Sequence, residues 1–162
     1  MPRITPNLWF DFNAEEAANF YVSIFPNSKV GKIARYTEVG PGPAGTAVTV
    51  EWELDGQAFV GINGGPQFPF SEAVSMEIRC KDQQEVDYYW ERLLADGGRE
   101  SQCGWLRDRF GFSWQVVPQR LIDLMTDEDP DVVKRVTAAM LQMVKLDVGR
   151  LEDAATAGPV PA

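Results

Sequence analysis

Two stretches of the sequence decide the fold, because they repeat one pattern. Residues 13–21 read Asn13-Ala-Glu-Glu-Ala-Ala-Asn-Phe-Tyr21, and residues 82–90 read Asp82-Gln-Gln-Glu-Val-Asp-Tyr-Tyr-Trp90. Each begins with a residue that favours the N-cap of a helix and has a glutamate three positions later, which is the capping-box pattern. An aromatic pair begins seven residues after each cap, on the stripe that an amphipathic helix buries. The sequence therefore predicts two helices of the same construction.

Strand-like runs surround both predicted helices. Alternating apolar residues precede the first helix at residues 8–10 and the second at residues 76–80. Asp55-Gly56 is a strong hairpin signal between two further runs. The strands expected after the helices cover residues 30–38, 47–54, 58–63, 105–109 and 113–117. The order is therefore βαβββ, repeated once, which indicates an internal duplication.

After Pro118 the pattern becomes helical. A short helix is expected at residues 121–125, and a second begins at Asp129-Pro130, since proline suits the first helical turn. A stripe of apolar residues continues to Val144, and a last amphipathic segment near Leu146 precedes a tail from Ala154. We expect a single α+β domain over residues 1–157, made of module one (3–70), module two (74–118) and a helical extension (119–157), with a tail at 158–162.

Composition and charge exclude several functions. The chain has no histidine, so a Ser-His-Asp triad, a Cys-His pair and a His-ligated metal are excluded. Its net charge of -9 would repel a phosphate backbone, which argues against nucleic-acid binding. The first six residues lack the layout of a signal peptide, and no apolar run is long enough to cross a membrane. We therefore expect a cytoplasmic protein without a nucleic-acid or membrane partner.

Several motifs resemble those of the PhnB-like branch of the vicinal oxygen chelate superfamily, which often carries the name 3-demethylubiquinone-9 3-methyltransferase. The superfamily includes glyoxalase I, bleomycin-resistance proteins and extradiol dioxygenases. The resemblance runs from about Ile4 to Leu151. The motifs that carry it are residues 13–21, Phe25-Pro-Asn-Ser28, Asn63-Gly-Gly65, residues 108–115 (Asp-Arg-Phe-Gly-Phe-Ser-Trp-Gln) and Met143-Val-Lys-Leu-Asp147. It implies two βαβββ modules that form a curved, barrel-like mixed sheet around a cleft, and a homodimer.

The resemblance also identifies four positions at which metal-using relatives carry His and Glu ligands. In this sequence strand alternation assigns those positions to Thr5, Gly61, Ser75 and Gln115. None of these residues is a good ligand for zinc, iron or nickel. We therefore expect no metal and no cofactor, although a wrong placement would reopen a glyoxalase- or dioxygenase-like mechanism.

A ligand pocket is expected to persist without the metal. Its lining of aromatic and scattered polar groups suits a small aromatic or amphipathic molecule. Trp105, beside Gly104, is expected on a loop that closes over the ligand. The full set of expected pocket residues is Thr5, Asn7, Trp9, Glu51, Gly61, Asn63, Ser75, Glu77, Trp105 and Gln115.

The sequence leaves three functions open. A metal-independent binding protein explains the missing ligands directly and needs no catalytic group, so it is favoured over an enzyme. The alternative is a metal-free enzyme of the PhnB-like group, although residues 40–45 are interrupted by prolines and open no helix of the nucleotide-binding kind. The third is an interaction protein that uses its C-terminal helices. No catalytic residue can be assigned in any of these.

Overall fold

The computed structural model describes residues 3–158, and it divides into two compact units, Met1–Phe70 and Ser71–Ala162. Each unit contains one βαβββ module with an open, four-stranded mixed sheet. The predicted α+β class and the duplication are thus confirmed. Of the predicted tail, only Gly158 falls within the described residues.

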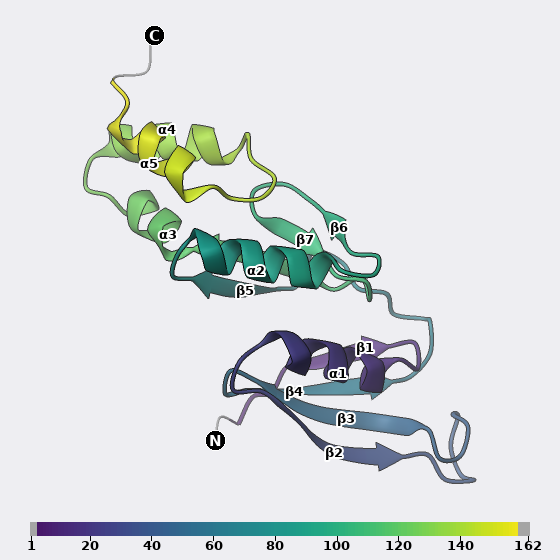
Figure 1. Ribbon diagram of the computed structural model, residues 1–162. Coiled ribbons are helices and arrows are strands. Elements are labelled where there is room, and N and C mark those ends of the chain that lie inside the picture. Colours follow the sequence, from purple (N-terminus) through teal and green to yellow (C-terminus); the bar gives the residue numbers. More distant parts are fainter. Residues whose placement is uncertain (1–2, 159–162) are drawn as a thin grey trace. The chain divides into compact units, whose positions relative to one another are not determined.

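The N-terminal unit is one helix packed on one sheet (Figure 1). Its elements are β1 (Asn7–Phe10), α1 (Ala14–Ile24), β2 (Lys29–Arg35), β3 (Ala47–Leu54) and β4 (Gln57–Asn63). The strand order is β1-β4-β3-β2, with β1 parallel to β4 and the other pairs antiparallel. Period-two alternation sends Leu8, Phe10 and Trp52 into the core beneath α1, where the Trp52 ring stacks on Phe59 at 5.8 Å.

The start of α1 differs from the sequence-based prediction. Asn13 is the N-cap residue, but its side chain makes no capping hydrogen bond, so the part of the predicted capping box that Asn13 supplies was wrong. Instead the Ala14 N–H donates to the Asn63 Oδ1 at 3.0 Å, while the Asn63 Nδ2 donates to the Ala47 carbonyl at 3.0 Å. A buried residue from the end of β4 therefore caps the helix and joins it to β3.

The module in the C-terminal unit has the same topology. Its elements are β5 (Ser75–Cys80), α2 (Gln83–Leu94), β6 (Arg99–Glu100), β7 (Trp105–Arg107) and β8 (Ser113–Pro118), and the strand order is β5-β8-β7-β6. Here the predicted cap is confirmed: Asp82 accepts from the Glu85 N–H at 2.9 Å. The Glu85 carboxylate accepts from the Lys81 N–H at 2.8 Å, so both side chains of the motif are used.

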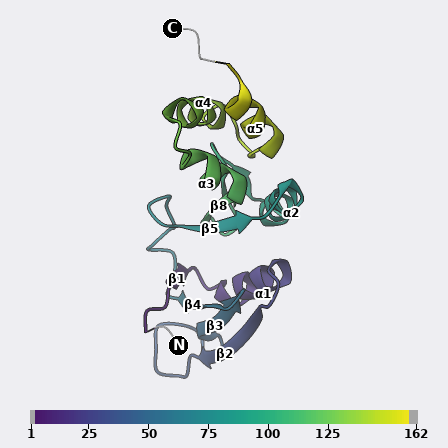
Figure 2. The ribbon, with the colours of Figure 1, turned by 90° about the vertical axis from the view of Figure 1, so that its left-hand side faces the viewer.

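Three helices form the extension of the C-terminal unit: α3 (Gln119–Met125), α4 (Pro130–Met140) and α5 (Val148–Thr156). Figure 2 shows them grouped at one end of this unit. Their apolar faces share a core of their own, which includes Val117, Leu121, Val136, Met143, Leu146 and Leu151. Two expectations need correction: α4 ends before Val144, which is half exposed, and residues 154–156 continue α5 and are not part of the tail.

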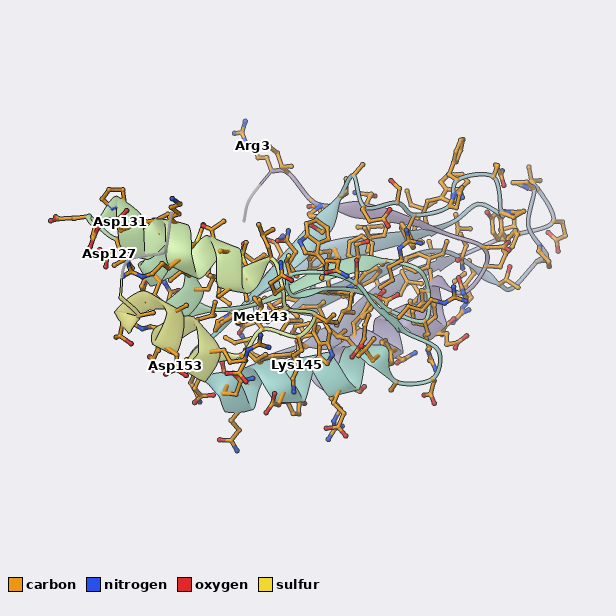
Figure 3. The ribbon with its side chains drawn as sticks, turned by 90° about the horizontal axis from the view of Figure 1, so that it is seen from above. Arg3, Asp127, Asp131, Met143, Lys145 and Asp153 are labelled. Atoms are coloured by element: carbon orange, nitrogen blue, oxygen red, sulfur yellow. The ribbon has the colours of Figure 1, made fainter. Side chains whose placement is uncertain are left out.

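Backbone hydrogen bonds attach this extension to the module. The Cys103 N–H donates to the Met143 carbonyl at 2.9 Å, and the Gly104 N–H donates to the Val144 carbonyl at 2.7 Å. Figure 3 shows Lys145 beside α2, where its ammonium contacts the Asp87 carboxylate at 2.6 Å. The extension is therefore part of the folded C-terminal unit. None of the helices within residues 3–158 is long and apolar enough to span a bilayer.

Candidate functional site

The face of the N-terminal sheet opposite α1 holds an open pocket of about 380 Å³. Ladder register explains its composition, because residues paired across neighbouring strands share a face: Asn7 pairs with Val60, and Val60 pairs with Glu51. The lining residues are Thr5, Lys29, Gly31, Glu51, Trp52, Glu53, Ala58, Phe59 and Val60. The volume lies within the range of about 300–1,000 Å³ that small-molecule sites occupy.

The pocket combines an apolar floor with charged groups. Ala58 and Val60 are half-buried on β4. Lys29 and Glu53 form an ion pair at 3.6 Å, and the lysine side chain is largely exposed. The Glu51 carboxylate has no hydrogen bond or ion pair with any of residues 3–158. The pocket therefore offers apolar area and one carboxylate that is free to bind a ligand.

Of the predicted residues of the first module, Thr5 and Glu51 line this pocket. Asn7 and Trp9 share its face of the sheet, but they are engaged with neighbours. The Asn7 Nδ2 donates to the Thr5 carbonyl at 2.9 Å, and the Trp9 Nε1 donates to the Gly65 carbonyl at 2.8 Å. The Trp9 ring also meets the Phe68 ring edge-on at 5.0 Å, so these two rings form an aromatic ledge beside the sheet.

Gly61 and Asn63 lie on the opposite face, and their predicted placement in the pocket was wrong. Gly61 pairs with Leu8 and Val50, and a Cβ on it would approach the Ala14 Cβ at 2.9 Å under α1. Asn63 caps α1. The reason is the period of two along β4: residues 58, 60 and 62 face away from the helix, so residues 61 and 63 face toward it.

The predicted residues of the second module meet on the face opposite α2. Gln115 pairs with both Glu77 and Trp105 across the ladder, and its Nε2 donates to the Ser75 Oγ at 2.9 Å. The Glu77 carboxylate is held by Arg79 at 2.8 Å. Trp105 is the first residue of β7, within the strand predicted at residues 105–109, and strand pairing fixes it, so the expected loop that closes over a ligand was wrong.

The residues at the superfamily's metal positions do not fit a metal ion. Gly61 offers no side chain and faces the helix, and the side chains of Ser75 and Gln115 bond to each other. Thr5 lies in the other unit from these last two. Among residues 3–158 no three His, Cys, Asp or Glu residues gather in a way that could hold a metal. These donor groups therefore support no chemical step through a metal ion.

The two cysteines differ in exposure. Cys80 is buried on β5, and burial raises the pKa of its thiol to about 12, with the carboxylates of Glu85 and Asp82 adding to the effect. Cys103 is partly exposed in the turn before β7 and has a positive φ of 56°. At neutral pH the Cys80 thiol is therefore neutral and shielded from solvent.

Two groups of residues were missed by sequence reasoning. The pocket residues Ala58 and Val60 follow from the Asp55-Gly56 turn, whose two-residue loop fixes β3 against β4 and so places Ala58 opposite Glu53. Lys29 is placed by its pairing with Glu53 between β2 and β3. The second is Asp108, a buried carboxylate at the β7–β8 turn. It accepts from the Phe110 and Phe112 N–H groups at 2.9 and 3.1 Å and from the Trp114 Nε1 at 2.9 Å. Its role is to fix the turn, and no local signal distinguishes it from a solvated aspartate.

A sequence profile of the 3-demethylubiquinone-9 3-methyltransferase family matches residues 2–117. The chain belongs to this family. The PhnB protein from Bacillus cereus is 36% identical to it, over 72% of this chain and 99% of that one, with a TM-score of 0.66. The family match ends at residue 117, so α3, α4 and α5 lie beyond it. No curated protein matches the chain.

More distant structures share the fold of the family. Protein PA1353 from Pseudomonas aeruginosa is 20% identical, over 73% of this chain and 98% of that one, with a TM-score of 0.58. The fosfomycin resistance protein FosX from Listeria monocytogenes, in complex with Mn(II) and sulfate, is 13% identical, over 72% of this chain and 89% of that one, with a TM-score of 0.51. PhnB and FosX are members of the vicinal oxygen chelate superfamily, and the predicted resemblance is confirmed.

Proposed function

We propose that this protein binds a small aromatic or amphipathic molecule without the help of a metal ion, in the pocket on β3 and β4. One observation carries the proposal. A pocket of about 380 Å³ places the apolar side chains of Ala58 and Val60 beside the unpartnered carboxylate of Glu51. An apolar body can be desolvated on the floor while a polar end contacts the carboxylate.

Metal independence rests on the donor set. Catalytic metals in proteins are held by imidazole, thiolate or carboxylate groups in a fixed geometry. Thr5, Ser75 and Gln115 offer only hydroxyls and an amide, and Gly61 offers nothing. A binding protein needs no such centre, because burial and hydrogen bonding supply its affinity.

The test is a binding titration with a fluorescent amphipathic probe, N-phenyl-1-naphthylamine. We expect micromolar affinity, about 8 kcal/mol of binding free energy, that is unchanged by a chelator. Ala58→Trp fills the pocket and is expected to weaken binding at least tenfold. Ala34→Trp on the exposed part of β2 is the matched control and is expected to change nothing.

If Ala58→Trp and Ala34→Trp bind the probe equally well, the pocket on β3 and β4 is not the binding site. A near-stoichiometric metal in protein purified without a tag or chelator, together with loss of binding on its removal, would overturn metal independence. It would also reopen a glyoxalase- or dioxygenase-like reaction.

The name of the family favours a second candidate, a metal-free methyltransferase. Against it, the Gly40–Gly45 loop leads into strand β3 rather than a helix, and the ring of Tyr36 fills the space beside Gly42. Nucleotide-type cofactors are usually bound where a glycine-rich turn opens a helix. Calorimetric titration with S-adenosylmethionine decides: saturable heat would favour the enzyme, and its absence the binding protein. The homodimer and the cytoplasmic location both remain predictions. Sedimentation velocity tests the first by measuring the mass of the protein in solution.

A further inference from the structure

Two arginines face each other on the C-terminal sheet. Arg99 on β6 and Arg107 on β7 are direct partners in the antiparallel ladder. Both are exposed, and with Glu72, Glu100 and Ser101 they line a second pocket, of about 240 Å³. Like charges opposite each other on neighbouring strands repel, so this pair is unfavourable unless an anion lies between them.

Hydroxyl groups continue the same row across the sheet. Arg107 pairs with Ser113 on β8, and Ser113 pairs with Ser75 on β5, so all lie on the face opposite α2. The Ser113 Oγ is buried, at 1% exposure for the residue, and has no hydrogen-bond partner among residues 3–158. A buried hydroxyl without a partner is costly, and Ser113 lies beside Arg107 in this row without lining the pocket itself.

The lining of this pocket holds two arginines and two glutamates, so its formal charge is zero in a chain whose net charge is -9. Arg99 has no hydrogen bond or ion pair with any described residue. The Glu100 carboxylate makes no ion pair with Arg99, and it accepts from the Trp90 Nε1 of α2 at 3.0 Å. The Glu72 carboxylate alone pairs with Arg107 on this face. Of these two guanidinium groups, only that of Arg107 therefore has a carboxylate partner among the described residues.

We propose that this pocket is a binding site for an oxyanion, a carboxylate or phosphate group held by Arg99 and Arg107. The Glu72 carboxylate forms an ion pair with Arg107, so a carboxylate of this protein already occupies part of the site. That hydrogen bond also holds the pKa of Glu72 below its usual value, so the carboxylate is ionised at neutral pH. A ligand oxyanion competes with Glu72 and gains Arg99 as a second, forked partner.

The site is independent of the pocket on β3 and β4, since every residue that forms it belongs to the C-terminal unit. Its test is an NMR titration of the ¹⁵N-labelled full chain with inorganic phosphate and with acetate at constant ionic strength. Backbone signals of β6, β7 and β8 and the arginine Nε–H signals report binding. The two anions distinguish a phosphate site from a carboxylate site.

Three variants and a control make the titration specific. Arg99→Gln and Arg107→Gln are each expected to weaken binding of the preferred anion about tenfold, as the loss of a charge-assisted hydrogen bond does. Glu72→Gln removes the competitor and is expected to strengthen binding about two- to fivefold. Arg120→Gln removes an equal charge from α3, where Arg120 pairs with Glu152, and is expected to leave binding unchanged.

Saturable shifts that follow this pattern support the site. The inference is overturned if neither anion binds more tightly than about 0.1 M. It is also overturned if Arg120→Gln weakens binding as much as Arg99→Gln, or if Glu72→Gln leaves the affinity unchanged. All four side chains are exposed, so the fold of each variant is expected to be retained, which far-UV circular dichroism checks.

Discussion

Replacing Asn63 is expected to destabilise the N-terminal unit more than replacing Asn13, although Asn13 carries the motif. Asn63→Ala leaves the Ala14 N–H and the Ala47 carbonyl without their partner, and both residues are buried. Each unsatisfied group costs about 1–3 kcal/mol, so the free energy of unfolding is expected to fall by about 2–6 kcal/mol. Asn13→Ala removes no capping bond and is expected to change it by less than about 0.5 kcal/mol.

Urea denaturation followed by far-UV circular dichroism measures both values, with the m-value as a check on cooperativity. Asp82→Ala is the matched reference, because Asp82 does cap its helix, and it is expected to cost about 1 kcal/mol. The reasoning is refuted if Asn13→Ala costs as much as Asp82→Ala. A loss of less than about 0.5 kcal/mol for Asn63→Ala would refute it equally.

Three further predictions concern the C-terminal unit. In urea denaturation, Gly104→Ala is expected to lower the free energy of unfolding by at least about 1 kcal/mol more than Gly111→Ala does. Both glycines have a positive φ, but only a Cβ on Gly104 would meet other atoms, the nearest being the Leu146 Cδ1 at 2.7 Å. Equal losses would contradict this. In the native protein at pH 8, iodoacetamide is expected to react with Cys103 and not with Cys80, which is expected to react only in urea. Mass spectrometry of the peptides measures both. Rapid labelling of Cys80 in the native protein would contradict its burial. The hydrogen bond with Lys145 lowers the pKa of Asp87. The contact is therefore expected to be complete above the ordinary aspartate pKa of 3.8 and to weaken as the pH falls through the lower pKa of the folded protein. An NMR pH titration that gives an unshifted pKa for Asp87 would contradict it.

The order of elements was predictable because it is encoded locally. Apolar alternation, the capping motifs and the Asp55-Gly56 turn each act within a few residues, and together they indicated βαβββ twice. The buried tryptophans Trp52 and Trp90 followed from periodicity as well. Ser75 and Gln115 were expected at corresponding positions on their strands, and they form a hydrogen bond.

The wrong predictions concern residues whose orientation depends on a partner far away in the sequence. Asn63 lies one position out of phase with the pocket, and only the register of β4 against β1 shows that it faces the helix. Trp105 was expected both in a strand and on a loop beside Gly104, and its pairing with β8 decides for the strand. The Arg99–Arg107 pair is likewise invisible in sequence, because a two-residue strand such as β6 carries no period.

The different caps of α1 and α2 have a consequence for the order in which the modules acquire structure. The partners that cap α2 lie within four residues of each other, so this helix can nucleate while the chain around it is still unfolded. The cap of α1 comes from Asn63, separated from Ala14 by 49 positions, and it is in place only after β3 and β4 have been assembled. Closing so long a loop is slow. In this duplicated fold, α2 is thus expected to form early, whereas α1 is expected to form only after β4 has paired.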